Sequence, residues 1–364
     1  MEKTNRLEWI DIAKGIGIVL VVFAHTLVPQ IRESSTAAGF LWIFIYNFHM
    51  PLFFFLSGWL FEKGLSHYTN KPKFILGKLK FLMLPYLTFS VFAYVFINFA
   101  LKIDKLAAVL QGGGYTATAL KDAALQILTY NGHIDQHLWF VFSLFIVFLV
   151  NILLPKIMKS KPVLLVLLAL YVSKAFVHYP GILDYTASDL LFFSLSRVML
   201  ADGKPHLINR SPLRIIAVLA IFITSNCIYS YFYVTQMPVG AVKALLYVIR
   251  SISSVAGIMC VCTLAEYIQG KAVSKPIKEI GLYSYDIYLM HAPFLVSGSM
   301  GILLSYSSLP APLCCASVLI IGIALPYAVS RFIVRKIPAL SVLILGKSFK
   351  KTKNTPEIKL NESI

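Results

Sequence analysis

Ten long apolar runs, separated by short polar segments, account for most of the chain. Most of these runs reach the roughly 20 apolar residues with which an α-helix crosses the hydrocarbon core of a bilayer. The runs occupy residues 10–29, 40–61, 76–101, 137–155, 162–179, 182–200, 213–235, 240–267, 281–304 and 311–334. The pattern predicts an all-α integral membrane protein with about ten transmembrane helices in one bundle, within residues 1–345.

Two shorter features complete the predicted layout. The fifth and sixth runs are separated only by Pro180 and Gly181, which predicts a tight helical hairpin. Residues 346–364 are polar and rich in lysine, which is typical of a disordered tail.

The composition supports a membrane protein, because the polar coat of a soluble globule is missing. Apolar residues make up 58% of the chain and charged residues 13%, and the mean hydropathy is +0.76. The five cysteines lie in apolar segments without the C-x-x-C spacing of zinc sites, so we expect neither a metal site nor a disulfide framework.

Basic residues are concentrated in alternate connections. They precede the first run and follow the second, fourth, sixth, eighth and tenth runs, whereas the intervening connections contain only Arg32, Lys102, Lys105 and Lys121. By the positive-inside rule, both termini of this multi-pass protein are then cytoplasmic. The net charge of +17 therefore reflects topology and contact with anionic lipid, and does not indicate nucleic-acid binding.

The first run carries three ionisable side chains, Asp11, Lys14 and His25. At 100° per residue, Lys14 and His25 fall within about 20° of one another, and Asp11 lies about 40° to the other side. The helical rise separates the ammonium from the imidazole by roughly 16 Å. Since ionisable groups normally avoid lipid, the three predict a polar track inside the bundle. The alternative is a snorkelling Lys14 and a hydrogen-bonded core His25.

The second run enters from the outside and carries His49. Because the first two helices are antiparallel, both His25 and His49 fall in the outer half of the bilayer, and His49 is a candidate to face His25. Ser57 and Gly58 near the inner end predict close approach of another helix. Packing alone is the alternative reading of this stretch.

Further polar residues occur in the sixth and ninth runs. Asp189 and Arg197 lie toward helix ends, where snorkelling accounts for most such residues, although Arg197 is also a candidate to bind an anionic group. In the ninth run, Ser284, Tyr288 and His291 share one helix face. His291 lies near mid-membrane, where an unpaired imidazole is costly.

The longest exterior connection, residues 102–136, has no obvious structure in the sequence. It delivers His133, Asp135, His137 and Trp139 to the outer mouth of the fourth helix, where they are candidates to contact a sugar. The alternative for Trp139 is an ordinary aromatic anchor at the membrane interface.

Several of these stretches together resemble the membrane-bound acyltransferase-3 family, in its fucose 4-O-acetylase-like branch: KGIGIVLVVFAHT, FFFLSG, LPYL, HLWF and SYDIYLMH. The resemblance implies a ten-helix protein of a bacterial inner membrane that acts as an O-acyltransferase of surface glycans or lipid-linked sugars. The family signature of arginine, ten residues and histidine falls on Lys14 and His25, so a lysine replaces the arginine. Lys80 and Pro85 resemble the basic-plus-proline motif of the third helix, whereas the sixth helix lacks the glycine expected there.

The resemblance implies transfer of an acyl group, with acetyl as the expected one, from cytoplasmic acyl-CoA to a hydroxyl of a cell-envelope glycan or lipid-linked sugar. Acetyl-CoA is then a substrate, and no permanently bound cofactor is expected. His25 is the expected chemical centre, as general base or acyl carrier. Lys14 and Asp11, on the same helix face, are the other expected catalytic residues. The expected donor-binding residues are Lys14, Lys78, Lys80 and Arg197, and the expected acceptor-binding residues are His49, His137, Trp139 and His291.

Two other classes of function fit the same composition. A transporter of a sugar, lipid-linked glycan or organic anion would use the buried charges as a substrate path, but the chain shows no two-half symmetry. A scaffold for envelope assembly would leave the polar track unexplained.

Overall fold

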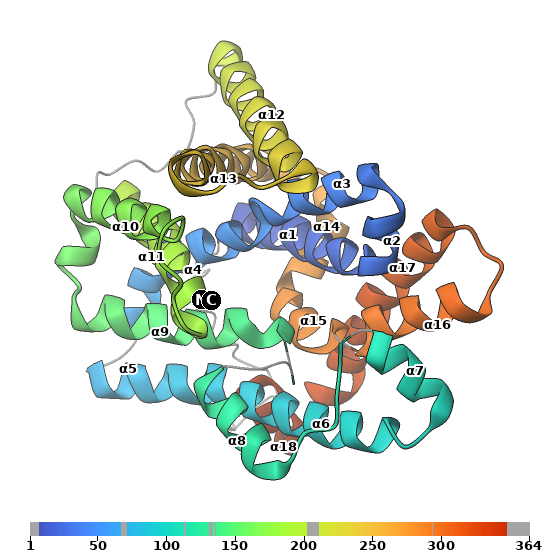
Figure 1. Ribbon diagram of the computed structural model, residues 1–364. Coiled ribbons are helices and arrows are strands. Elements are labelled where there is room, and N and C mark those ends of the chain that lie inside the picture. Colours follow the sequence, from blue (N-terminus) through green and yellow to red (C-terminus); the bar gives the residue numbers. More distant parts are fainter. Residues whose placement is uncertain are drawn as a thin grey trace.

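The computed structural model describes residues 7–66, 71–112, 114–130, 134, 136–201, 211–292 and 294–347. Within these ranges the regular structure is helical throughout, which confirms the predicted all-α class. The helices surround α1 (Glu8–Thr26), which lies near the middle of the bundle (Figure 1).

Seven helical segments in the described ranges are long and apolar enough to cross a membrane. They are α1, α3 (Thr36–Tyr46) with α4 (His49–Ser66), α5 (Lys71–Lys78) with η1 (Leu79–Met83) and α6 (Leu84–Ala100), η2 (Gln136–Leu138) with α9 (Trp139–Leu153), α12 (Pro212–Thr235), α13 (Gly240–Ile268), and α17 (Ala311–Val329) with η5 (Ser330–Val334). A bent pair, α15 (Ser284–His291) and η4 (Phe294–Gly298) with α16 (Ser299–Tyr306), makes an eighth if it is counted as one span.

The predicted number of ten spans is not confirmed. Of the two remaining predicted segments, α10 (Lys161–Ser173) has only 13 residues, or about 20 Å of helix. The other, α11 (Ile182–Ala201), has 20 residues, and several of them are charged. These two helices do pack together, but residues 174–181 connect them, so the connection is longer than the predicted Pro-Gly turn. The other helices are α2 (Pro29–Ser34), α7 (Asp104–Gly112), α8 (Leu120–Thr129), η3 (Ile157–Lys159), α14 (Ser274–Leu282) and α18 (Pro338–Leu345).

Glycines let α14 lie directly against the first half of α1. A Cβ on Gly15 would come within 2.0 Å of the carbonyl oxygen of Ile277, and one on Gly281 within 1.8 Å of the carbonyl oxygen of Asp11. Such backbone-to-backbone contact is how helices associate closely in membranes. It leaves the Asp11 residue only 4% exposed.

The predicted close approach at Ser57-Gly58 is confirmed, and the partner is α11. A Cβ on Gly58 would come within 2.2 Å of Ser196 Oγ and 2.3 Å of the carbonyl oxygen of Phe193. The helix α4 therefore packs against α11 without room for a larger residue.

Two further predictions about local structure are wrong. The exterior connection 102–136 is not structureless, because it contains α7 and α8. The ninth span is not continuous either: α15 ends at His291, since Ala292 adopts an extended conformation (φ −128°, ψ 164°). The break leaves His291 at a helix end.

Candidate functional site

Three imidazole rings meet beside the end of α1. The His291 ring lies 4.9 Å from the His25 ring and 5.7 Å from the His137 ring, measured between ring centroids, and both pairs meet edge to face. The three residues come from α1, η2 and α15, which are far apart in the sequence. We call His25, His137 and His291 the histidine cluster.

Local structure positions each member of the histidine cluster. His25 lies in the last turn of α1, and His291 is the last residue of α15. Tyr288, one turn before His291, donates its hydroxyl hydrogen to the carbonyl oxygen of His137 and so ties η2 to α15. This hydrogen bond therefore adds to the contact of the His137 and His291 rings in joining the two segments.

Hydrogen bonds fix the proton positions on two of these rings and on His49. Nδ1 of His25 lies 2.8 Å from the carbonyl oxygen of Val21. Nδ1 of His49 lies at the same distance from the carbonyl oxygen of Ile45, and Nδ1 of His291 from that of Tyr288. Because a carbonyl oxygen only accepts, we assign the proton of each neutral ring to Nδ1, and Nε2 then carries the lone pair. This is the tautomer in which Nε2 accepts a proton or attacks a carbonyl carbon.

The Nε2 atom of His291 is buried and has no hydrogen-bond partner among the described residues. Buried polar atoms are rarely left unpaired, and those that are often belong to functional sites. The atom is thus available to a substrate group that enters the histidine cluster.

His49 does not meet His25 ring to ring; Tyr46 contacts both. The Tyr46 ring centroid lies 4.8 Å from that of His49 and 6.2 Å from that of His25. Tyr46 was not among the predicted site residues; it ends α3 three residues before His49, which begins α4.

Cations gather toward the other end of α1. Lys14 and Lys78 lie close enough for their charges to interact. The Lys78 residue is only 5% exposed, and its ammonium lies 4.4 Å from the ring centroid of Phe148. Two neighbouring cations of this kind could bind an anionic ligand such as a phosphate group.

Residues 7–331 match the family model described as an acyltransferase domain, that of acyltransferase 3. The chain belongs to the acyltransferase-3 family. The match includes every member of the histidine cluster as well as Lys14 and Lys78, and with the apolar helices it indicates a multi-pass membrane acyltransferase. A search of curated proteins and a search of solved structures returned no match. The fucose 4-O-acetylase-like branch stays a prediction.

The snorkelling prediction for the polar residues of α11 in this acyltransferase is wrong. Arg197 is 1% exposed, donates from Nη1 to Asn151 Oδ1 at 2.5 Å, and lies 4.6 Å from the ring centroid of Phe61. Asp189 is 4% exposed and accepts a hydrogen bond from Ser143 Oγ. Both residues face the bundle interior, where protein partners compensate for the lost water.

The remaining predicted site residues of the acyltransferase are dispersed. Lys80 is exposed on η1, and Asp11 is buried about 21 Å of helical rise below His25. Trp139 is half-buried and stacks on Tyr185 at 4.7 Å between centroids. His133 and Asp135 lie outside the described residues. No group of three or more His, Cys, Asp or Glu side chains within the described ranges is arranged to hold a metal ion.

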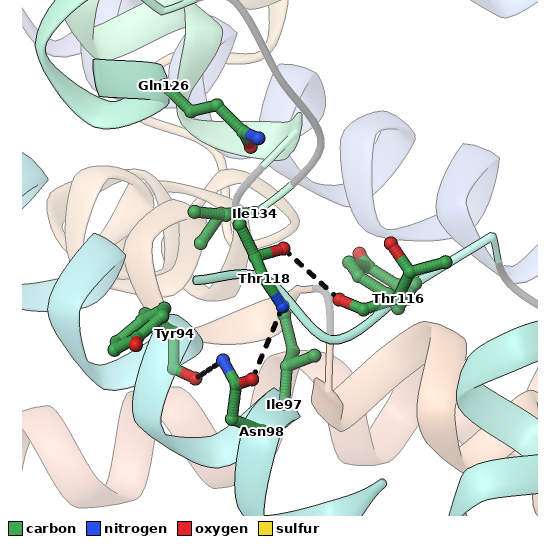
Figure 2. A pocket seen from close by; sticks show the side chains of 8 residues that line it. Tyr94, Ile97, Asn98, Thr116, Thr118, Gln126 and Ile134 are labelled. Atoms are coloured by element: carbon green, nitrogen blue, oxygen red, sulfur yellow. Dashed lines mark hydrogen bonds between the residues drawn. The ribbon is translucent and has the colours of Figure 1, made fainter. Parts of the chain in front are cut away.

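The segment of residues 114–134 and α6 also line a small polar cavity of about 50 Å³, shown in Figure 2. Asn98 on α6 donates to the carbonyl oxygen of Tyr94 and accepts from the backbone N–H of Thr118, and Gln126 of α8 and Ile134 complete part of the wall. This volume suits one or two waters and is too small for a sugar ring. The cavity therefore belongs to the packing of the exterior segment.

Proposed function

We propose that this acyltransferase moves an acetyl group from cytoplasmic acetyl-CoA to a hydroxyl of a cell-envelope glycan or lipid-linked sugar. The observation that carries the proposal is the pair of sites along α1. Lys14 and Lys78 lie toward its first residues, and the histidine cluster lies beside its last turn. The two sites are separated by roughly 16 Å of helical rise, which matches the reach of a pantetheine arm.

In this mechanism the cations hold the phosphates of CoA at the cytoplasmic end, and the thioester extends to the histidine cluster. Nε2 of His25 takes the proton of the sugar hydroxyl while the hydroxyl oxygen attacks the thioester carbonyl carbon. The C–S bond then breaks, and the CoA thiolate leaves and takes up the proton from the imidazolium. The products are the O-acetyl sugar and CoA with a free thiol.

A covalent route uses the same atoms. Nε2 of His25 attacks the thioester carbonyl carbon, the C–S bond breaks, and CoA leaves as a thiolate. The sugar hydroxyl oxygen then attacks the acetyl carbon and releases the neutral imidazole, and the hydroxyl proton goes to the thiolate. In either route, His137, His291 and His49 are candidates to bind the acceptor. Nε2 of His291 and Nε2 of His49 carry a lone pair in the assigned tautomer, so each would accept a hydrogen bond from a sugar hydroxyl. Trp139, two residues after His137, is a further candidate to contact the acceptor.

Transfer of labelled acetyl groups tests the proposal directly. Membranes that contain the protein receive acetyl-CoA labelled in the acetyl group, and label is then sought in the glycan and lipid-linked sugar fractions. We expect label in one of these fractions with wild-type protein and none with His25→Ala. Transport of a glycan without label, in the same membranes, would instead support a transporter.

Orientation gives a first prediction, because the mechanism needs the first residues of α1 at the cytoplasmic face. In a cysteine-free background, a membrane-impermeant thiol reagent should label Ala117→Cys in intact cells and spare Lys275→Cys, which is exposed on α14. After the cells are permeabilised, both variants should be labelled. The opposite pattern in intact cells would contradict the orientation.

Donor binding gives a second prediction. Lys14→Gln and Lys78→Gln should each raise KM for acetyl-CoA by about 10- to 100-fold, the range expected for a lost hydrogen bond to a charged group. Lys14→Arg should retain activity, because it restores the arginine of the family signature and keeps the charge.

Steady-state kinetics of purified variants provide the measurement. Lys156→Gln, an exposed lysine after α9, is the matched control and should leave KM unchanged. Lys80→Gln should have a smaller effect than Lys78→Gln, because Lys80 is exposed. If both Lys14→Gln and Lys78→Gln kept the wild-type KM for acetyl-CoA, donor binding at this end of the bundle would be contradicted.

A further inference from the structure

Arg32 lies close to the histidine cluster on a short helix that follows α1. The chain turns after Thr26, whose carbonyl oxygen accepts from the N–H of Val28, and α2 begins at Pro29. The N–H of Arg32 donates to the carbonyl oxygen of Val28 at 3.1 Å. This turn places α2 against α3 at the end of α1 that carries His25 (Figure 1).

A row of aromatic rings links Arg32 to His25. The guanidinium carbon of Arg32 lies 4.0 Å from the ring centroid of Trp42, and the Trp42 centroid lies 4.3 Å from that of Tyr46. Tyr46 in turn contacts the His25 ring. The charge of Arg32 is also within electrostatic range of His25. A cation–π contact with tryptophan holds a guanidinium in one place.

Within the described part of the chain, at least one donor of this guanidinium is unused. Nε of Arg32 is buried and has no hydrogen-bond partner among the described residues. An arginine carries five N–H donors, and a buried donor without an acceptor is costly. A ligand with anionic oxygens would satisfy these donors.

The position of Arg32 is also unusual in this sequence. The connections that alternate with the basic ones contain only four lysines or arginines, so the positive-inside rule does not explain a cation there. Arg32 is half-buried and stacked on an aromatic ring. A guanidinium in this position suits anion binding, because its planar group of N–H donors matches the oxygens of a carboxylate or a phosphate.

We propose that Arg32, held by Trp42, forms an anion-binding subsite for the acceptor next to the histidine cluster. The acceptor then carries an anionic group, a carboxylate or a phosphate, near the hydroxyl that is acylated. Two sources fit this chemistry: the carboxylate of an acidic sugar, or the phosphate that joins a sugar to its lipid carrier. That the bound anion belongs to the acceptor rests on the proposed function, whereas the binding of an anion at Arg32 can be tested separately.

The test is binding of soluble probes, measured by saturation-transfer NMR with the protein in nanodiscs of zwitterionic lipid. The probes are methyl β-glucuronide, glucose 1-phosphate and the neutral methyl β-glucoside. We expect at least one anionic probe to bind wild-type protein more tightly than the neutral probe. The preferred anion identifies the source, since the glucuronide represents an acidic sugar and glucose 1-phosphate the lipid-linked phosphate.

Variants assign the binding to Arg32. Arg32→Gln should weaken the preferred anion about ten-fold or more and leave the neutral probe unchanged, and Arg32→Lys should fall between, because it keeps the charge without the fork. Lys121→Gln, another exterior cation that is exposed on α8, is the matched control and should bind like wild type. The Arg32→Lys result remains informative if Arg32→Gln does not fold.

Two results would overturn the subsite. One is wild-type protein that binds the anionic probes no more tightly than the neutral one; the other is unchanged anion binding in folded Arg32→Gln. Because binding needs no turnover, His25→Ala should bind the probes normally. Probe binding that depends on Arg32, in a protein without acyl transfer, would refute the proposed function and leave the anion site intact.

Discussion

Replacing His25 with alanine is expected to reduce acetyl transfer by about 10²- to 10⁴-fold, the contribution typical of a positioned general base. The loss would be larger if the imidazole itself carries the acetyl group. The reason is geometric: His25 shares a helix with Lys14, contacts His291, and has its proton fixed on Nδ1 by the carbonyl oxygen of Val21. In the proposed mechanism, its Nε2 is the base or the nucleophile.

The assay is turnover of purified variants, normalised to the amount of folded protein. His178→Ala is the matched control, because His178 is exposed before α11, and it should be as active as wild type. His49→Ala and His291→Ala should lose less activity or should also lower the yield, since both rings are buried. Near-normal turnover in His25→Ala would contradict the role of His25 as base or nucleophile, and His291 and His49 would be the next candidates.

The placement of α1 could be read from its sequence because the relevant physics is local. The positions of Lys14 and His25 on one face follow from helical geometry, and the cost of ionisable groups in lipid places that face inward. The close approach at Gly58 follows in the same way from small residues in an apolar helix. No long-range information was needed for either feature.

The composition of the histidine cluster could not be derived in this way. His25, His137 and His291 meet through tertiary packing and the contact of Tyr288 with η2, and nothing in the sequence pairs those segments. The burial of Arg197 could not be derived for a similar reason, because its partner Asn151 lies on another helix.

The break after His291 did have a local signal. A proline follows Ala292, and the residue before a proline is disfavoured in the α-helical region of backbone conformation. The extended conformation of Ala292 agrees with this rule. The long apolar run concealed the signal, because hydropathy measures composition and is insensitive to one extended residue.

A buried ion-pair network gives the second large expected effect. Asp286 on α15 is 1% exposed and accepts hydrogen bonds from Arg335 Nε at 2.7 Å, from Lys347 Nζ at 3.2 Å and from the hydroxyl of Ser330. The guanidinium of Arg335 also lies 3.8 Å from the ring centroid of Tyr283. These contacts tie η5 and the residues after α18 to α15, although Asp286 lies in the family-like motif and invites a catalytic reading.

Asp286→Asn should therefore act on folding, with a loss of about 3–5 kcal/mol in stability, because it leaves Arg335 buried beside an uncharged partner. The expected readouts are a lower Tm and less monodisperse protein in detergent, whereas KM for acetyl-CoA in the surviving folded fraction stays near wild type. Glu279→Gln is the control: its pair with Arg331 is exposed, so its effect on Tm should be small.

A second substitution separates the two roles of Asp286. Arg335→Met in the Asp286→Asn background removes the stranded charge and should recover part of the lost Tm, since apolar side chains often replace a buried ion pair at little cost. A catalytic Asp286 would behave differently, because no change at Arg335 could restore a missing reactive group. Stable, monodisperse Asp286→Asn protein without turnover would thus contradict the structural role and place Asp286 in the reaction, five residues along α15 from His291.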